Sequence, residues 1–168
     1  MMWVLIVSEL LVFGAGLTAF LAMRLTDPTG FAEAQAHLHR AGAALNTVVL
    51  VTSGLLAALA MRAAATGAIR RKQALLAGAM ALGVLFLAIK TVEYADKAAQ
   101  GIGWESHIFF TFYYLLTGFH AAHVVAGILL LGLVAVLRSP RATETGAAFW
   151  HMVDLVWVLL FPVIYLVR

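Results

Sequence analysis

Long apolar segments separated by short polar stretches make up most of this chain. Five of them are long enough to cross a bilayer, because about 20 apolar residues span its hydrocarbon core as a helix. They cover residues 3–23, 43–61, 74–94, 107–137 and 148–167. The pattern predicts an all-α membrane protein, a bundle of five transmembrane helices that forms a single domain over residues 1–168.

Two segments and one polar stretch add detail. The first segment lacks the basic start, short apolar core and cleavage site of a signal peptide, so we expect a retained helix. The fourth runs for about 31 residues, which predicts tilt or extension beyond the bilayer. Residues 31–40 hold several polar side chains between the first two segments and predict a short interfacial helix.

Composition supports the membrane class and excludes several kinds of site. The chain is 64% hydrophobic and 11% charged, whereas soluble domains are about a quarter charged. There is no cysteine, which excludes disulfides, zinc–thiolate sites, iron–sulfur clusters and covalent c-type haem. In a membrane protein a formal charge of +3 indicates orientation in the bilayer and not nucleic-acid binding.

The charges in the loops predict the orientation. The loops on the side of the N-terminus carry Arg62, Arg70, Arg71, Lys72, Arg138 and Arg141, with one acid, Glu144. The opposite side carries Arg24, Arg40, Lys97 and a terminal anchor, Arg168, offset by Asp27, Glu33, Asp96 and Glu105. Because basic loops stay in the cytoplasm, the N-terminus is predicted to be cytoplasmic and the C-terminus outside.

Small residues recur at a spacing of four on two segments. Gly14 and Thr18 lie on the first, and Gly118, Ala122 and Ala126 on the fourth. This spacing lets transmembrane helices approach closely, so we expect helix packing at these positions.

Seven ionisable residues fall within or at the edges of the apolar segments. They are Glu9, Lys90, Glu93, His120, His123, His151 and Asp154. Each costs about 3 kcal/mol or more at the bilayer centre unless it faces protein, water or a partner. This set is therefore the candidate site, as an intramembrane polar network or a contact with a partner or lipid.

Depth along the helices predicts that these residues form two layers. At about 1.5 Å per residue, Glu9, His151 and Asp154 share a layer near the cytoplasmic side, where a carboxylate–imidazole network would join the first and fifth helices. The second layer lies nearer the outer face and contains two i, i+3 pairs. These pairs are Lys90 with Glu93, and His120 with His123.

The chemistry of these pairs leaves three interpretations. The favoured interpretation is that these residues form hydrogen bonds between helices. On that interpretation we expect no catalytic residue, cofactor site or metal site in the chain. A haem held by His120 and His123 would make it a small cytochrome b, but a bis-histidine haem needs partner histidines at matching depth on another helix. A proton-conducting protein is the third, because chains of Glu, Asp and His mark proton paths.

Five stretches together resemble subunit III of the haem–copper oxidase superfamily over residues 3–165. They are Ile6-Val7-Ser8-Glu9, Leu45-Asn46-Thr47, Lys90-Thr91-Val92-Glu93-Tyr94, Thr117-Gly118-Phe119-His120-Ala121-Ala122-His123-Val124, and Trp150-His151-Met152-Val153-Asp154-Leu155-Val156-Trp157. Each stretch falls on the corresponding helix, in the family's order.

The length and one further stretch point to a branch of that family. The mitochondrial-type subunit has seven spans, and this chain resembles a form without the first two. The sequence Ala34-Gln35-Ala36-His37-Leu38-His39-Arg40 is most similar to the nitric-oxide-reductase E proteins. The alternative is subunit III of a terminal cytochrome c or quinol oxidase.

The resemblance implies an accessory subunit that is not itself an enzyme and carries no redox cofactor. It would lie in the bacterial cytoplasmic membrane beside the haem-bearing catalytic subunit of nitric oxide reductase, and support assembly, stability or sustained turnover. The family binds phospholipid, in a cleft that is incomplete without the first two helices. Glu9 matches the family's intramembrane glutamate, which reacts with carbodiimides. Other characteristic polar positions of the family match His120, His123, His151 and Asp154, whereas Ala121 replaces a usual glycine.

Overall fold

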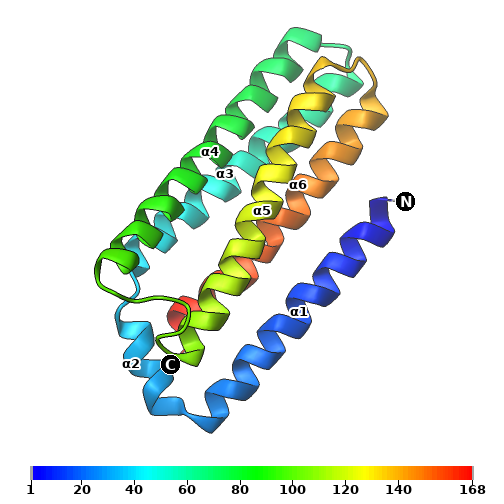
Figure 1. Cartoon of the computed structure of the whole chain (residues 1–168). Helices are drawn as coiled ribbons and strands as arrows, with labels where there is room; N and C mark the ends of the chain where they lie inside the picture. The colour runs from blue at the N-terminus through cyan, green and yellow to red at the C-terminus, as the bar shows by residue number, and fades with distance from the viewer. Residues whose placement is uncertain (1, 168) are drawn as a thin grey trace.

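The computed structural model describes residues 2–167 as six α-helices and a terminal π-helical turn (Figure 1). The elements are α1 (Met2–Thr26), α2 (Pro28–Ala36), α3 (Arg40–Ala65), α4 (Ile69–Ala99), α5 (Ile108–Val136), α6 (Pro140–Phe161) and η1 (Pro162–Leu166). No strand occurs within residues 2–167. Five helices, α1, α3, α4, α5 and α6 with η1, are long and apolar enough to cross a membrane. The predicted five-helix, all-α membrane fold is confirmed.

Four of the five helices extend beyond the apolar segments that predict them. The third segment, 74–94, becomes the 31-residue α4, which makes α4 the longest helix in place of the 29-residue α5. The fifth begins eight residues early because Ser139 caps it, accepting a hydrogen bond from the Ala142 N–H at 3.3 Å. Polar residues continue these helices past the hydrocarbon core, where hydropathy gives no signal. The predicted anchor Arg168 lies outside the described residues.

The short helix predicted over residues 31–40 is present as α2, which begins and ends earlier than that range. Asp27 caps it by accepting the Gly30 N–H at 3.0 Å, and Pro28 occupies its first turn, where no N–H is needed. We call the end of the bundle beside α2 the α2 end. The opposite end, with the α3–α4 and α5–α6 loops, is the two-loop end (Figure 1).

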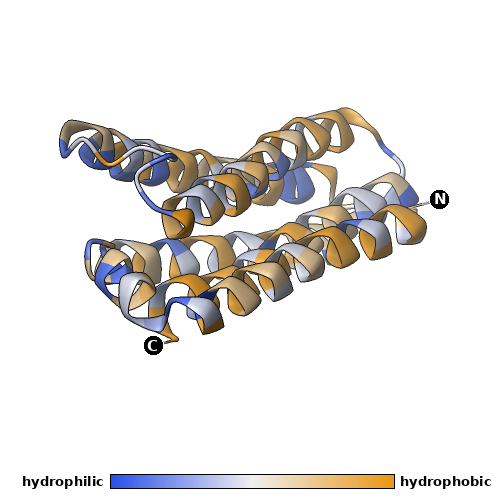
Figure 2. Cartoon of the chain, turned by 60° about the horizontal axis from the view of Figure 1, so that its bottom comes forward, coloured by the Kyte–Doolittle hydropathy of each residue, from blue (hydrophilic) through white to orange (hydrophobic). Residues whose placement is uncertain are grey.

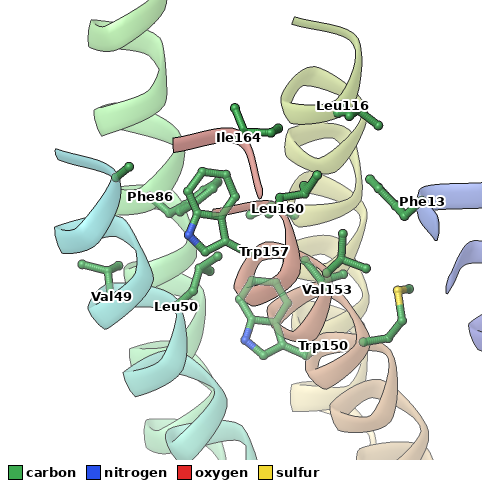
Figure 3. Close-up of a cluster of buried hydrophobic side chains, with 14 of the residues drawn as sticks. Phe13, Val49, Leu50, Phe86, Leu116, Trp150, Val153, Trp157, Leu160 and Ile164 are labelled. Atoms are coloured by element: carbon green, nitrogen blue, oxygen red, sulfur yellow. The ribbon is translucent and has the colours of Figure 1, made fainter. Parts of the chain in front are cut away.

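Helices α3, α4, α5 and α6 form a four-helix bundle in which α6 packs against α3 and α5, diagonally opposite α4, and α1 runs along α5 and α6 (Figure 1). Hydrophobic residues follow the lengths of the helices and hydrophilic ones gather mainly at their ends (Figure 2). Trp150 and Trp157 fill the core (Figure 3). Their indole N–H groups donate to the hydroxyls of Ser53 at 3.0 Å and Thr47 at 3.1 Å, so both rings are buried with their polar groups satisfied.

Close helix packing occurs at other glycines than the predicted ones. A methyl group added at Gly14 or Gly118 would meet nothing within 4 Å. At Gly83 and Gly127 it would come within 2.7 and 2.6 Å of the Trp150 ring. The predicted positions are wrong because the spacing of small residues does not reveal which face meets a neighbour, whereas a large buried ring requires glycine opposite it.

Candidate functional site

A buried charged cluster lies toward the α2 end and joins α4, α5 and η1. The Lys90 ammonium, only 1% exposed, donates to Glu93 Oε2 at 2.9 Å and to the hydroxyls of Tyr113 at 3.2 Å and Tyr165 at 2.9 Å. The Tyr165 hydroxyl in turn donates to Glu93 Oε1 at 2.9 Å. All three ammonium protons have acceptors, so a neutral, satisfied pair occupies this position.

Tyr165 reaches the cluster because the chain changes its helical period at Pro162. Proline has no N–H for the α-helical ladder, and the Val167 N–H bonds to Pro162 O at 2.9 Å in a π-helical turn. Gln35 Nε2 donates to Val167 O at 3.0 Å, and Arg24 donates to the same carbonyl. Helices α1 and α2 therefore hold the turn that presents Tyr165.

Glu9 on α1 pairs with His123 on α5. Glu9 Oε2 lies 3.1 Å from His123 Nε2, while His123 Nδ1 lies 2.8 Å from the Phe119 carbonyl oxygen. A carbonyl only accepts, so Nδ1 carries a proton. Glu9 Oε2 is buried and has no hydrogen-bond partner of good geometry among residues 2–167, so its link to His123 is a close polar contact between two helices.

This pairing corrects the predicted layers, in which Glu9 lay with His151 and Asp154. Glu9 lies seven residues after α1 begins, and His123 lies 13 residues before α5 ends at the same end of the bundle. The two residues meet because α1 begins short of the two-loop end (Figure 1). The predicted depths were obtained by counting residues from the start of each helix. That count assumes that all helices begin at the same level along the bundle, and α1 does not.

His151 and Asp154 lie together on α6 and face α3. His151 Nδ1 is 3.9 Å from Asp154 Oδ2, and both side chains approach Gly54, where an added methyl group would collide with the Asp154 carboxylate. Asp154 is 8% exposed. His151 also lines a cavity of about 450 Å³ between α1, α3 and α6. The pair predicted from the i, i+3 spacing is present. It packs against Gly54 on α3, and not against Glu9 on α1 as predicted.

His120 is separate from His123 despite the i, i+3 spacing. Its ring is fully buried among Phe13, Phe86 and Trp157, with centroid distances of 6.3, 5.5 and 5.3 Å. Neither ring nitrogen has a hydrogen-bond partner among residues 2–167. Of the two histidines, only His123 makes an inter-helix polar contact.

A histidine–carboxylate pair between α2 and α5, at the α2 end, was not predicted. His107 Nδ1 accepts the Phe109 N–H at 3.1 Å and so caps α5. His107 Nε2, which carries the proton, lies 3.2 Å from Asp27 Oδ2, the cap of α2. The hydrogen bond from the Gly30 N–H, and then that from His107, lower the pKa of the Asp27 carboxyl. Each residue precedes a helix start, which was the signal available in the sequence.

The seven predicted residues thus separate into three linked pairs and one isolated imidazole. Within residues 2–167, no three side chains of His, Asp or Glu are placed to hold one metal ion. The arrangement can fix helices against one another.

A family model described as cytochrome c oxidase subunit III matches residues 1–167. The chain belongs to the cytochrome c oxidase subunit III family. Cytochrome c oxidase subunit 3 of Corynebacterium diphtheriae is 30% identical over 98% of this chain and 86% of its own length. Cytochrome bo(3) ubiquinol oxidase subunit 3 of Pseudomonas aeruginosa is 32% identical over 73% of this chain and 62% of its own. The family predicted from the five sequence stretches is confirmed.

One relative combines two subunits in its name. The haem–copper oxidase subunit I+III of Aeropyrum pernix is 30% identical over 99% of this chain, which covers 22% of that protein. The whole of this chain therefore corresponds to part of a longer polypeptide in that organism.

Proposed function

We propose that this chain is a non-catalytic subunit that packs beside the haem-bearing catalytic chain of a haem–copper-type respiratory complex. The observation that carries the proposal is the match to the subunit III family over residues 1–167. The name of the Aeropyrum pernix relative, which joins subunits I and III, supports the same neighbour. The complex would lie in a bacterial cytoplasmic membrane, with the N-terminus of this chain in the cytoplasm.

An oxygen-reducing oxidase is the first candidate complex. The relatives from Corynebacterium diphtheriae and Pseudomonas aeruginosa are both named as oxidase subunits. Nitric oxide reductase is the second candidate, favoured by the stretch from Ala34 to Arg40 and by the short chain, and it stays a prediction. The identity of the co-purifying catalytic chain distinguishes the two.

The packing of the histidines favours an accessory role over a small cytochrome b. The His120 ring is enclosed by three aromatic rings, and both nitrogens of His123 are engaged, with Phe119 O and Glu9. A haem would have to displace these contacts. A haem absorption band in the isolated chain would overturn this argument.

The same packing disfavours proton conduction through this chain. His120, which has no polar partner among the described residues, lies between the Glu9–His123 pair and the Lys90 cluster, so the hydrogen-bonded chain is interrupted there. Proton flux into liposomes containing the chain alone would contradict this interpretation.

We assign the Glu9–His123 pair a role in association with, or turnover of, the catalytic partner. Glu9→Gln keeps a side chain of the same shape but removes the carboxyl group that lies 3.1 Å from His123 Nε2. Insertion and helix content should be unchanged. Complex yield or turnover should fall by about threefold, the effect of an average polar contact between membrane helices.

The matched control is Glu33→Gln, an exposed carboxyl on α2 outside the membrane-spanning helices. It should leave yield and turnover unchanged. If Glu9→Gln also leaves both unchanged, the role assigned to the pair is refuted, while co-purification still tests the accessory function.

A further inference from the structure

The cavity of about 450 Å³ between α1, α3 and α6 lies where α1 begins. Helix α1 starts short of the two-loop end, whereas α3 and α6 continue past its first turn (Figure 1). Trp3 on α1, Met61 on α3, and Glu144 and His151 on α6 are among the residues that line this cavity. We call it the Glu144 recess. It is the place where α3 and α6 run on without a third helix beside them.

The lining of the Glu144 recess combines an apolar wall with two polar groups that can accept hydrogen bonds. Apart from Glu144 and His151, every lining residue is apolar, and two of them, Met61 and Met152, have flexible side chains that adapt to what they contact. Trp3 stands at the edge with 74% of its surface exposed. A tryptophan ring attracts a cation placed over its face. The recess therefore offers a carboxylate, an imidazole and an indole to a positively charged group.

The charge of the surroundings makes this carboxylate unusual. The two-loop end carries six basic residues and one acid, which is Glu144. Within residues 2–167, Glu144 forms no ion pair, although Arg141 lies one turn before it on α6. A carboxylate above an apolar cavity suits a lysine or arginine side chain, which buries its aliphatic stem and keeps its charged tip at the polar edge.

The level of the recess along the bundle indicates where such a side chain comes from. The recess lies near the ends of three membrane-spanning helices, on the side predicted to be cytoplasmic. Lysine and arginine are concentrated at the cytoplasmic ends of transmembrane helices. A neighbouring membrane helix therefore carries basic side chains at the level of Glu144.

We propose that the Glu144 recess receives a lysine or arginine side chain from the cytoplasmic end of a helix of the catalytic partner. The cation would pair with Glu144 beside the ring of Trp3, and the stem would contact Met61 and Met152. This inference rests on the proposed function, and it assigns one contact of the subunit interface to α1, α3 and α6.

The first test uses the complex purified from native membranes in mild detergent, with its dissociation constant measured by native mass spectrometry over a dilution series. Glu144→Gln keeps the shape of the side chain but removes its charge, and should weaken the complex about fivefold, as the loss of one ion pair does. Glu144→Lys adds repulsion and should weaken it about twentyfold. The matched control is Glu33→Lys, the same reversal of an exposed acid at the α2 end, which should leave the dissociation constant unchanged.

Thiol labelling tests whether the partner covers the recess. The chain has no cysteine, so Ala148→Cys places a single thiol on the lining of the recess. This thiol should react with a maleimide in the isolated chain and be protected in the complex. The control is Ala65→Cys, at the exposed end of α3 and outside the recess, which should react in both states.

The outcomes separate this inference from the proposed function. Wild-type affinity in both Glu144 variants, or equal labelling of Ala148→Cys in the free and bound chain, would overturn the inference while the complex still forms. Protection of Ala148→Cys in the chain alone would show that a second copy fills the recess, and would overturn it as well. If no catalytic chain co-purifies with wild type, the proposed function is refuted and the inference with it. If circular dichroism shows that Glu144→Lys loses helix content, Glu144→Gln carries the test.

Discussion

The Lys90–Glu93 cluster gives the sharpest prediction of stability. Glu93→Gln keeps the shape of the side chain but removes the negative charge 2.9 Å from the Lys90 ammonium. Because Lys90 is 1% exposed, its charge would then be buried with only neutral acceptors, the hydroxyls of Tyr113 and Tyr165. Breaking a buried pair in this way costs about 3–5 kcal/mol, and no cavity adds to the cost.

A double-mutant cycle separates charge coupling from general damage. Lys90→Met should also destabilise the protein by about 3–5 kcal/mol, because it leaves Glu93 charged without a cation. The double variant, with both charges removed, should be more stable than the sum of the two changes by at least about 2 kcal/mol. The measurement is unfolding by sodium dodecyl sulfate in mixed micelles, followed by circular dichroism.

Thr91→Ala is the matched control for this cycle. Thr91 lies between the two residues on α4 but is exposed and bonds only to Leu87 O. It should change the free energy of unfolding by less than about 0.5 kcal/mol. Single variants within about 1 kcal/mol of wild type, or an additive double variant, would refute the reasoning that the cluster is charge-coupled.

Two further predictions concern α3 and the α2 end. Gly54→Ala should lower the free energy of unfolding by about 1–3 kcal/mol, because the added methyl group collides with the buried Asp154 carboxylate on α6. Gly14→Ala, with open space around it, should raise the free energy of unfolding by up to about 1 kcal/mol. A stabilising Gly54→Ala or a destabilising Gly14→Ala would contradict the packing. The Asp27 pKa is lowered from 3.8 by the Gly30 N–H and then by His107, so its contribution to stability is present above about pH 4 and lost as the pH falls through the folded-state pKa. The difference in melting temperature between wild type and Asp27→Asn should therefore shrink in acid, and a constant difference down to pH 3 would count against it.

The sequence was sufficient to predict the five spans because a run of about 20 apolar residues is enough to identify a membrane-spanning helix. It was less reliable at their ends. Arg70, Arg71 and Lys72 lie inside α4, although a hydropathy pattern places them in a loop. Helix continues there because its backbone hydrogen bonds do not depend on side-chain polarity.

The candidate site was predictable only where it depends on one helix. Lys90 with Glu93 and His151 with Asp154 are i, i+3 pairs, and both occur in the structure. The partner of Glu9 depends on how far α1 is displaced along α5, which no local pattern encodes.

Tyr165 shows the same limit in another form. It enters the Lys90 cluster through a π-helical turn, so its position cannot be obtained by extending the α6 pattern. Local spacing thus predicts pairs within a helix, whereas contacts between helices require their relative displacement.

Affinity purification of the tagged chain from its native membrane in mild detergent tests the central claim most directly. Mass spectrometry and a haem absorption spectrum should then be recorded on the same fraction. The account predicts co-elution of a haem-bearing catalytic chain of the haem–copper type in a fixed ratio, with the haem absent from this chain once the two are separated. A folded chain that elutes without such a partner, or that keeps the haem itself, would contradict the account.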